Sequence, residues 1–256
     1  MMMKKPTEHL FIPDTQCKPG LTYEHLTALG NYIVKQQPDV IIHAGDHWDM
    51  HSLSSYDKST RKAEGARYEA DIQAGIEGME ALLAPINKYN RLRRKKYKPR
   101  LVFTLGNHEE RIMRHVNANP SLEGKLSYKD LQLEKFGWEV HDFLEVVEVD
   151  GISYSHYFYN PMSGKPWSGK ASTMLNNVGF SFTMGHRQGK DQAEKHLSNG
   201  RQIRALVAGS FYQHDEDYKG PQGNHHWRGV IYKHEVKDGS YDMMEVSMKY
   251  LLENWL

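Results

Sequence analysis

Residues 39–49 read Asp-Val-Ile-Ile-His-Ala-Gly-Asp-His-Trp-Asp, an apolar run that ends in a glycine turn and two carboxylates. The run predicts a buried strand, and the turn predicts a loop at its carboxyl end. Helical spacing over residues 22–37 and 64–89 separates this strand from strand-like runs at 8–13 and 100–105. Because strand and helix alternate, the N-terminal half predicts a layered α/β sheet with parallel neighbours.

The second half of the chain favours antiparallel or mixed pairing. We expect strands over residues 145–149, 152–155, 178–184, 204–208, 229–236 and 241–248. The tight turn Asp150-Gly151 and the segment 237–240 predict two hairpins among them. The sequence contains no internal repeat and no long linker. Residues 1–256 are therefore expected to form a single domain with two packed sheets.

The composition indicates the cellular compartment of the protein and restricts which residue types can bind a metal. The 256 residues include 33 Lys and Arg against 32 Asp and Glu, so attraction to nucleic acid needs local clustering of charge. Cys17 is the only cysteine, which excludes an internal disulfide and cysteine-based zinc clusters and fits a reducing compartment. No apolar run has the length of a membrane span or signal peptide. We expect a cytoplasmic protein without membrane contact.

Polar side chains follow five of the expected strands at the point where each strand ends. The blocks are Asp14-Thr-Gln16, Gly45-Asp46-His47-Trp48-Asp49, Gly106-Asn107-His108-Glu109, His156, and Gly185-His186-Arg187-Gln188. Loops at the carboxyl edge of a sheet share one rim, so these groups can converge. Each block alone is typical of a turn, a cap or a core histidine. Carboxylate and imidazole together in five such places predict a divalent metal centre.

The five blocks, in this order, resemble the signature of the calcineurin-like metallophosphoesterases over roughly residues 9–190. The resemblance implies a four-layer αββα sandwich of two mixed β-sheets flanked by helices. It also implies two divalent metal ions, with Asp14 anchoring the first and Asp46 bridging both. The second site would be made by Asp46, Asn107, His156 and His186.

Gln16 and Gln188 stand where the family has two histidines of the first metal site. Neutral amide oxygens favour harder ions, so we predict that the Asp14 site prefers Mn²⁺ or Mg²⁺ and is weaker than the second site. Zn²⁺, Fe or Mn²⁺ suits the site of His156 and His186. The alternative is that one or both glutamines do not bind metal.

The resemblance implies a divalent-metal-dependent phosphoester hydrolase in which a metal-bridging hydroxide is the nucleophile. His108 would be the general acid that protonates the departing alkoxide. Asp49 would orient and charge that imidazole.

Two further segments of the sequence indicate the class of substrate. Residues 91–100 hold seven basic side chains that can follow a nucleic-acid backbone, although such a run is more often a solvated helix end. Residues 157–170 form an aromatic and lysine-bearing loop beside His156, which either contacts substrate or only packs as a lid. The predicted substrate contacts are Arg111, Tyr159, Lys165 and Trp167.

These features favour a phosphodiesterase or nuclease acting on nucleic acid or a nucleotide. Protein phosphatases of the superfamily carry an Arg directly after Gly-Asp-x-x-Asp, where this chain has Met50 and His51, so a protein phosphatase acting on monoesters is the weaker alternative. A non-catalytic member that binds phosphoesters or a partner stays open because of the two glutamines. The chain also looks like phosphoesterases encoded by tailed bacteriophages. Its oligomeric state is left open.

Overall fold

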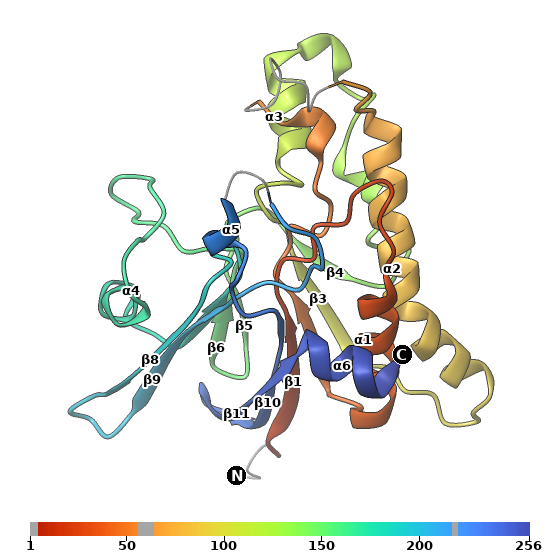
Figure 1. Ribbon diagram of the computed structural model, residues 1–256. Helices are drawn as coiled ribbons and strands as arrows, with labels where there is room; N and C mark the ends of the chain where they lie inside the picture. Colours follow the sequence, from red (N-terminus) through yellow and green to blue (C-terminus); the bar gives the residue numbers. More distant parts are fainter. Residues whose placement is uncertain (1–4, 56–63, 217–219) are drawn as a thin grey trace.

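The computed structural model describes residues 5–55, 64–216 and 220–256, which form two β-sheets with helices on their outer faces (Figure 1). The strands of the first sheet, in spatial order, are β11 (Ser240–Ser247), β10 (Gly229–Lys237), β1 (Thr7–Ile12), β2 (Val40–His43), β3 (Arg100–Thr104) and β4 (Glu139–His141). Those of the second are β5 (Val147–Val149), β6 (Ile152–Tyr154), β7 (Phe182–Met184), β9 (Gln202–Ala208) and β8 (Lys190–His196).

The helices connect and cover these sheets. The α-helices are α1 (Glu24–Gln36), α2 (Tyr68–Arg91), α3 (Arg111–Ala118), α4 (Ala171–Val178), α5 (Gly220–Gly223) and α6 (Met248–Trp255). Short 3₁₀ helices are η1 (His51–Leu53), η3 (Pro120–Leu122) and η4 (Tyr128–Leu131). In the described parts of the chain, no helix combines the length and the apolar character needed to cross a membrane.

The predicted parallel core of the first sheet is confirmed. Strands β1, β2, β3 and β4 pair in parallel, in the order in which they occur along the chain. In the second sheet β6, β7 and β9 are parallel, while β5 and β8 pair antiparallel at the two edges. Both predicted hairpins form, as β5 with β6 and as β10 with β11. Both sheets are therefore mixed.

The sheets differ from the sequence-based expectation in several details, among them strand β4, which was not expected. The C-terminal hairpin does not join the other strands of the second half, because β10 pairs with β1 in the first sheet. The strand expected over residues 178–184 begins only at Phe182, since α4 occupies the preceding segment and ends at Gly179 with φ +82°. Strand β8 was not expected because its polar residues are mostly exposed and show no apolar alternation, as is usual for an edge strand.

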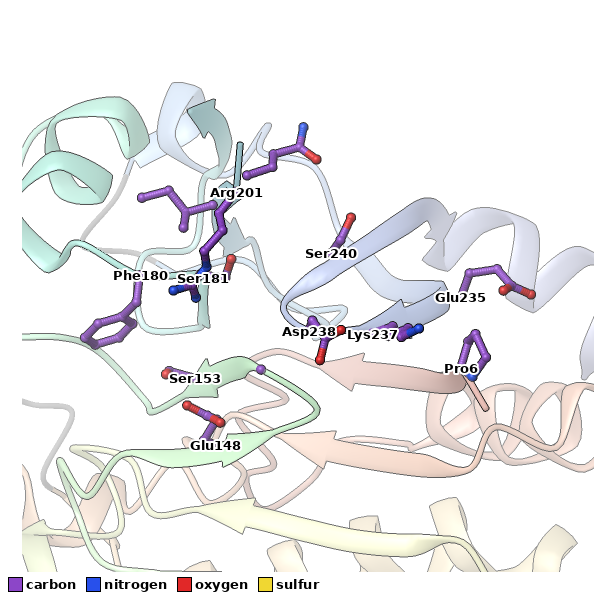
Figure 2. A pocket seen from close by; sticks show the side chains of 13 residues that line it. Pro6, Glu148, Ser153, Phe180, Ser181, Arg201, Glu235, Lys237, Asp238 and Ser240 are labelled. Carbon is purple, nitrogen blue, oxygen red and sulfur yellow. The ribbon is translucent and has the colours of Figure 1, made fainter. Parts of the chain in front are cut away.

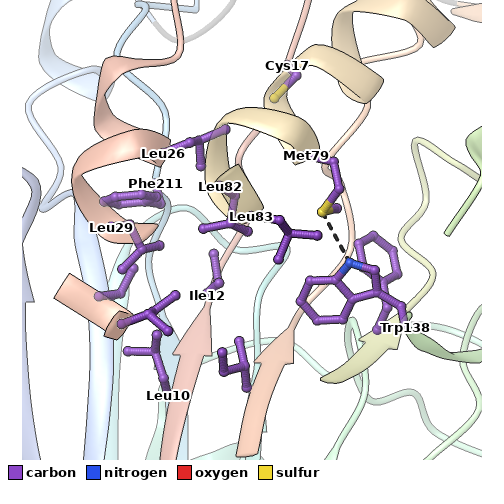
Figure 3. Packing of buried hydrophobic residues seen from close by; sticks show 14 of the residues in the cluster. Leu10, Ile12, Cys17, Leu26, Leu29, Met79, Leu82, Leu83, Trp138 and Phe211 are labelled. Carbon is purple, nitrogen blue, oxygen red and sulfur yellow. Dashed lines mark hydrogen bonds between the residues drawn. The ribbon is translucent and has the colours of Figure 1, made fainter. Parts of the chain in front are cut away.

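Alternating side chains divide the interior into three apolar clusters. Leu10 and Ile12 of β1 face α1, α2 and α6, whereas Phe11 between them faces the second sheet. Figure 3 shows the first cluster, including the hydrogen bond from Trp138 Nε1 to Met79 Sδ at 3.2 Å. The third cluster lies between α4 and the outer face of the second sheet. Three clusters between four layers confirm the αββα sandwich.

Trp48 fastens the loop after β2 to helix α2. Its Nε1 donates to the carbonyl of Ile72 at 3.1 Å, and a Cβ at Gly75 would lie only 1.9 Å from the same nitrogen. His47, which is fully buried, lies with Nε2 2.8 Å from the Gly75 carbonyl oxygen. The absence of a side chain at Gly75 thus lets α2 fix the position of residues 46–49.

A chain of buried polar side chains crosses the space between the sheets. Lys233 Nζ hydrogen-bonds to Thr183 Oγ1 and lies 3.3 Å from the Tyr154 hydroxyl, which is 2.8 Å from His9 Nδ1. The far nitrogen of His9 lies 3.1 Å from Asp150 Oδ2. Lys233 is fully buried, and burial together with the charge of Arg204 lowers its pKa well below the ordinary value.

The lowered pKa of Lys233 predicts a pH-dependent stability. Between that lowered pKa and about 10.4 the unfolded chain binds more protons than the folded one, so stability rises with pH. Replacing Lys233 by Met removes this dependence. The free energy of unfolding of wild type relative to Lys233→Met should therefore rise with pH, by up to about 1.4 kcal/mol per pH unit, in urea titrations between pH 8 and 10.

The exposed Lys249 supplies the matched control, since Lys249→Met should leave the pH dependence of wild type unchanged. Parallel stability curves for wild type and Lys233→Met would show that the folded protein keeps Lys233 charged.

Candidate metal centre

The fold brings the five sequence blocks to the carboxyl ends of neighbouring strands. Asp14 follows β1, Asp46 follows β2 and Asn107 follows β3, each at most three residues after the strand. His156 and His186 follow β6 and β7 in the second sheet in the same way. Since β1, β2 and β3 are parallel, as are β6 and β7, each set of loops leaves its sheet at one edge.

The residues predicted for the second metal site converge. Ligand atoms of Asp46, His156 and His186 all lie within 4.8 Å of one another. His156 Nε2 is 3.3 Å from Asp46 Oδ2 and 2.9 Å from Asn107 Oδ1, and the same amide oxygen is 2.7 Å from His186 Nδ1. Two imidazoles, a carboxylate and an amide oxygen thus surround one point, a donor set that suits a divalent transition metal.

The first metal site is built around Asp14, which is 1 % exposed. Its Oδ1 accepts a hydrogen bond from the backbone of His186 at 2.9 Å, but neither its Oδ2 nor Gln16 Oε1 has a hydrogen-bond partner in the described parts of the chain. The Gln16 backbone N–H donates to the Asp46 carbonyl at 2.9 Å. Two buried oxygens without donors fit an oxygen-liganded cation. Gln188 is half-buried in the turn before β8, and its binding to metal stays a prediction.

The carboxylates of the centre have opposite pKa shifts. Burial and the neighbouring Asp46 raise the pKa of Asp14 to about 7. Asp46 is buried too, but the charges of His108 and His156 outweigh burial and lower its pKa. Burial lowers the pKa of His156, yet Asp46 more than compensates and raises it to about 9. Adjacent buried carboxylates of this kind favour bound positive charge, which two divalent cations supply.

Two glycines allow the close approach of backbone and carboxylate. A Cβ at Gly106 would lie 2.2 Å from Asp46 Oδ1, and one at Gly185 would lie 2.4 Å from Asp14 Oδ1. Asp46 and His186 themselves adopt positive φ values of 47° and 63°. Left-handed backbone at non-glycine residues is costly and concentrates at functional sites.

His108 lies at the edge of this centre. Its Nδ1 lies 3.2 Å from Asp49 Oδ1 and 2.8 Å from the Asp49 carbonyl oxygen. Its Nε2 is 3.8 Å from Asp46 Oδ2 and 3.1 Å from the guanidinium of Arg111. Burial lowers the pKa of His108, but Asp46 and Asp49 outweigh it, and the net shift is upward.

The model of the calcineurin-like phosphoesterase family matches residues 10–241, most of the chain. The chain belongs to this family. A search of curated proteins finds no match. Family membership makes the chain a metal-dependent phosphoester hydrolase in general terms, and the cluster of Asp46, His156 and His186 is consistent with that chemistry.

Glu109 organises this calcineurin-like centre, a role that the sequence analysis missed. Its buried carboxylate accepts backbone hydrogen bonds from Asp46 at 2.8 Å, His47 at 2.7 Å, Trp48 at 3.0 Å and Gly106 at 2.8 Å. One side chain thus joins the loop after β2 to the loop after β3. The acidic fourth position of the Gly-Asn-His-Glu block was the available signal.

The predicted substrate contacts are only partly gathered at the centre. Arg111 of α3 donates to the Asp49 carbonyl at 2.7 Å, beside His108. Tyr159 and Lys165 are exposed in the loop between β6 and α4, and Trp167 packs against the apolar cluster under α4. Their contact with substrate stays a prediction.

An aromatic wall that the sequence analysis did not single out borders the second metal site. The ring of Tyr157 lies 4.7 Å from that of His186 and 5.6 Å from that of Phe143. The guanidinium of Arg114 lies 5.6 Å from the centre of the Phe143 ring. Tyr157 directly follows His156, so its place in the sequence was the available signal.

Other charged features lie at the opposite edge of the sheets. The basic segment 91–100 joins the end of α2 to the start of β3, and its basic side chains are exposed. A cavity of about 900 Å³ is lined by Gly151 and Asp238 in the two hairpin turns and by Arg201 before β9 (Figure 2). Both features therefore lie away from the carboxyl ends of the strands that carry the metal ligands.

The four hydrogen bonds of Glu109 predict that Glu109→Gln is destabilising, because the amide nitrogen of Gln would face backbone donors. We expect the free energy of unfolding to fall by about 2–4 kcal/mol in urea titrations. The exposed Glu134→Gln is the matched control and should change it by less than about 0.5 kcal/mol. Equal stability of wild type and Glu109→Gln would contradict a structural role for the four bonds.

Proposed function

We propose that the protein is a phosphodiesterase that acts on a nucleotide or nucleic acid and uses two divalent cations. The observation that carries this proposal is the convergence of the ligands Asp46, Asn107, His156 and His186 beside His108 at one edge of the sheets. Asp14 lies next to them through its hydrogen bond to the backbone of His186.

The donor sets support different ions at the two sites. Asp14, Asp46, Gln16 and, by the motif, Gln188 would hold the first cation through oxygen atoms, so Mn²⁺ or Mg²⁺ fits best there. The imidazoles of His156 and His186 favour a transition metal at the second site. When bound, such a pair lowers the pKa of coordinated water and neutralises charge on phosphoryl oxygens.

The side chains of the protein do the remaining work. When doubly protonated, His108 would offer the Nε2 proton to the departing alkoxide, while Asp49 accepts from Nδ1 and stabilises the protonated ring. In the neutral ring Nε2 accepts from Arg111, which can only donate. Arg111, within hydrogen-bond distance of His108 Nε2, is placed to turn toward a phosphate oxygen instead.

A diester is favoured over a phosphoprotein by the surroundings of the centre. The ring of Tyr157, which is partly exposed, is available for stacking by a base. A monoesterase acting on phosphoproteins and a non-catalytic binder of phosphoesters are the alternatives that the experiments below separate.

The proposed activity is tested with bis-p-nitrophenyl phosphate and added Mn²⁺. We expect hydrolysis by wild type that falls at least about 10³-fold in Asp46→Asn, because the shared carboxylate of both cations is lost. Asp242→Asn, at an exposed position of β11, is the matched control and should keep wild-type rates. Faster hydrolysis of the p-nitrophenyl monoester indicates a monoesterase, and ligand binding without turnover under any divalent ion indicates a binder.

The role of His108 predicts a dependence on the leaving group. His108→Ala should lower kcat by about 10²–10⁴-fold for a dinucleotide, whose alkoxide needs a proton, and much less for a p-nitrophenyl diester. Metal content, measured by elemental analysis, should stay at the wild-type level. An equal loss for both substrates, or a parallel loss of metal, would show that His108 is not the acid. His196→Ala, at an exposed position of β8, is the control.

A further inference from the structure

A second cavity, of about 160 Å³, adjoins the loop that carries Asp14. We call it the His25 pocket, and its main walls are Gln16, Tyr23, His25, Tyr212, Gln213 and His214. Three segments form it: the loop after β1, the first turn of α1 and the loop after β9. None of its residues was given a role by the metal-site motifs except Gln16.

The floor of the His25 pocket carries a buried imidazole without a well-formed hydrogen bond. His25 is 3 % exposed, and neither of its ring nitrogens makes a hydrogen bond of good geometry in the described parts of the chain, although the Gln213 side chain and the Phe211 backbone lie close enough to raise its pKa. Gln16, whose Oε1 is assigned to the first cation, links the pocket to the metal site. Buried polar atoms are nearly always hydrogen-bonded, and an unsatisfied one costs about 1–3 kcal/mol. A ligand that pairs with His25 would recover that cost.

The walls of the pocket favour an uncharged ligand. Burial lowers the pKa of His25 to about 4, so its imidazole is neutral near pH 7 and offers one donor and one acceptor. His214 is paired with Glu216, since its Nε2 lies 2.6 Å from Glu216 Oε1. The ring of Tyr212 stacks on His214 with centroids 4.6 Å apart, which makes one wall aromatic.

The size of the pocket selects a single ring. A cavity of ~150 Å³ accommodates benzene, so about 160 Å³ holds one six-membered ring. The buried His25 and Tyr212 lie inside, whereas Leu21, 37 % exposed, and Gln213 line the mouth. A ring can therefore enter from solvent and lie against the imidazole of His25.

The pocket and the first metal site share their backbone supports. Gln16 N–H donates to the Asp46 carbonyl at 2.9 Å, and Phe211 N–H, directly before Tyr212, donates to the Asp14 carbonyl at 2.7 Å. Both loops of the pocket are thus fixed to residues that bind the first cation. A substrate whose phosphate lies at the metals can place a neighbouring group here.

We propose that the His25 pocket binds the base of the substrate, an uncharged six-membered heteroaromatic ring of the pyrimidine type, with one ring nitrogen of His25 hydrogen-bonded to it. This inference rests on the proposed phosphodiesterase function and gives it a substrate class, esters of pyrimidine nucleotides.

The test compares two diesters with one leaving group, thymidine 5′-(p-nitrophenyl phosphate) and methyl p-nitrophenyl phosphate, in the presence of Mn²⁺. One recovered hydrogen bond to a buried polar group, worth about 1–3 kcal/mol, predicts that kcat/KM for the thymidine ester exceeds that for the methyl ester by about tenfold or more in wild type. In His25→Leu this ratio should fall to about one. The melting temperature of His25→Leu should match or exceed that of wild type, because a buried polar group without a well-formed hydrogen bond is removed.

A second variant keeps the test valid if His25→Leu does not fold. Leu21→Trp narrows the mouth and should also reduce the ratio to about one, whereas Leu256→Trp, a matched exposed site, should keep the wild-type ratio. Hydrolysis of both esters at equal kcat/KM by wild type, or an unchanged ratio in both pocket variants, overturns the pocket and leaves the proposed activity standing. Hydrolysis of neither ester overturns the proposed activity and the inference with it.

Discussion

The buried Asp46 is the group on which the rest of the centre depends. Its carbonyl accepts hydrogen bonds from Thr15 and Gln16, and its carboxylate accepts one from the backbone of His108 at 2.8 Å. Its own N–H donates to Glu109. Asp46 therefore joins the loops after β1, β2 and β3, and its carboxylate lies 3.3 Å from the imidazole of His156 from the other sheet. At the metal site, charge holds the two sheets together. The apolar cluster between the sheets adds to this.

The arrangement of charge and backbone at this centre lowers the stability of the folded protein, and interactions in the surrounding structure offset that loss. A buried carboxylate is costly, and left-handed backbone at Asp46 and His186 adds to that cost. Local hydrogen bonds offset this cost. Glu109 accepts hydrogen bonds from the backbone of the turn, and Trp48 fastens the turn to α2. Oxygens that the protein leaves unpaired, such as Asp14 Oδ2, remain available to a cation because no donor from the described chain occupies them.

The sequence predicted the parts of the molecule where pattern and chemistry are local. Apolar runs located β1, β2 and β3, and polar residues directly after strands located the side chains that converge at the candidate second metal site. Strand β8 was not predicted because an edge strand needs no apolar alternation. The role of Glu109 was not predicted because it depends on backbone contacts with another loop. The His25 pocket could not be predicted for a similar reason. Three segments distant in sequence form it, and no sequence motif indicates that they come together.

The length of α2 determines which substrates at the metal centre could also contact the basic segment 91–100. Gly75 lies under the metal loop, while Arg91 ends the same helix, and sixteen residues at 1.5 Å each separate them by roughly 24 Å. A mononucleotide or dinucleotide held at the cations cannot span that distance. Under the proposed function, recognition of a short substrate would therefore come from groups at the rim, such as Arg111, Tyr157 and the His25 pocket. The basic segment can add affinity only for a polymer long enough to run along α2, so its contribution should grow with the length of the nucleic acid and weaken with salt.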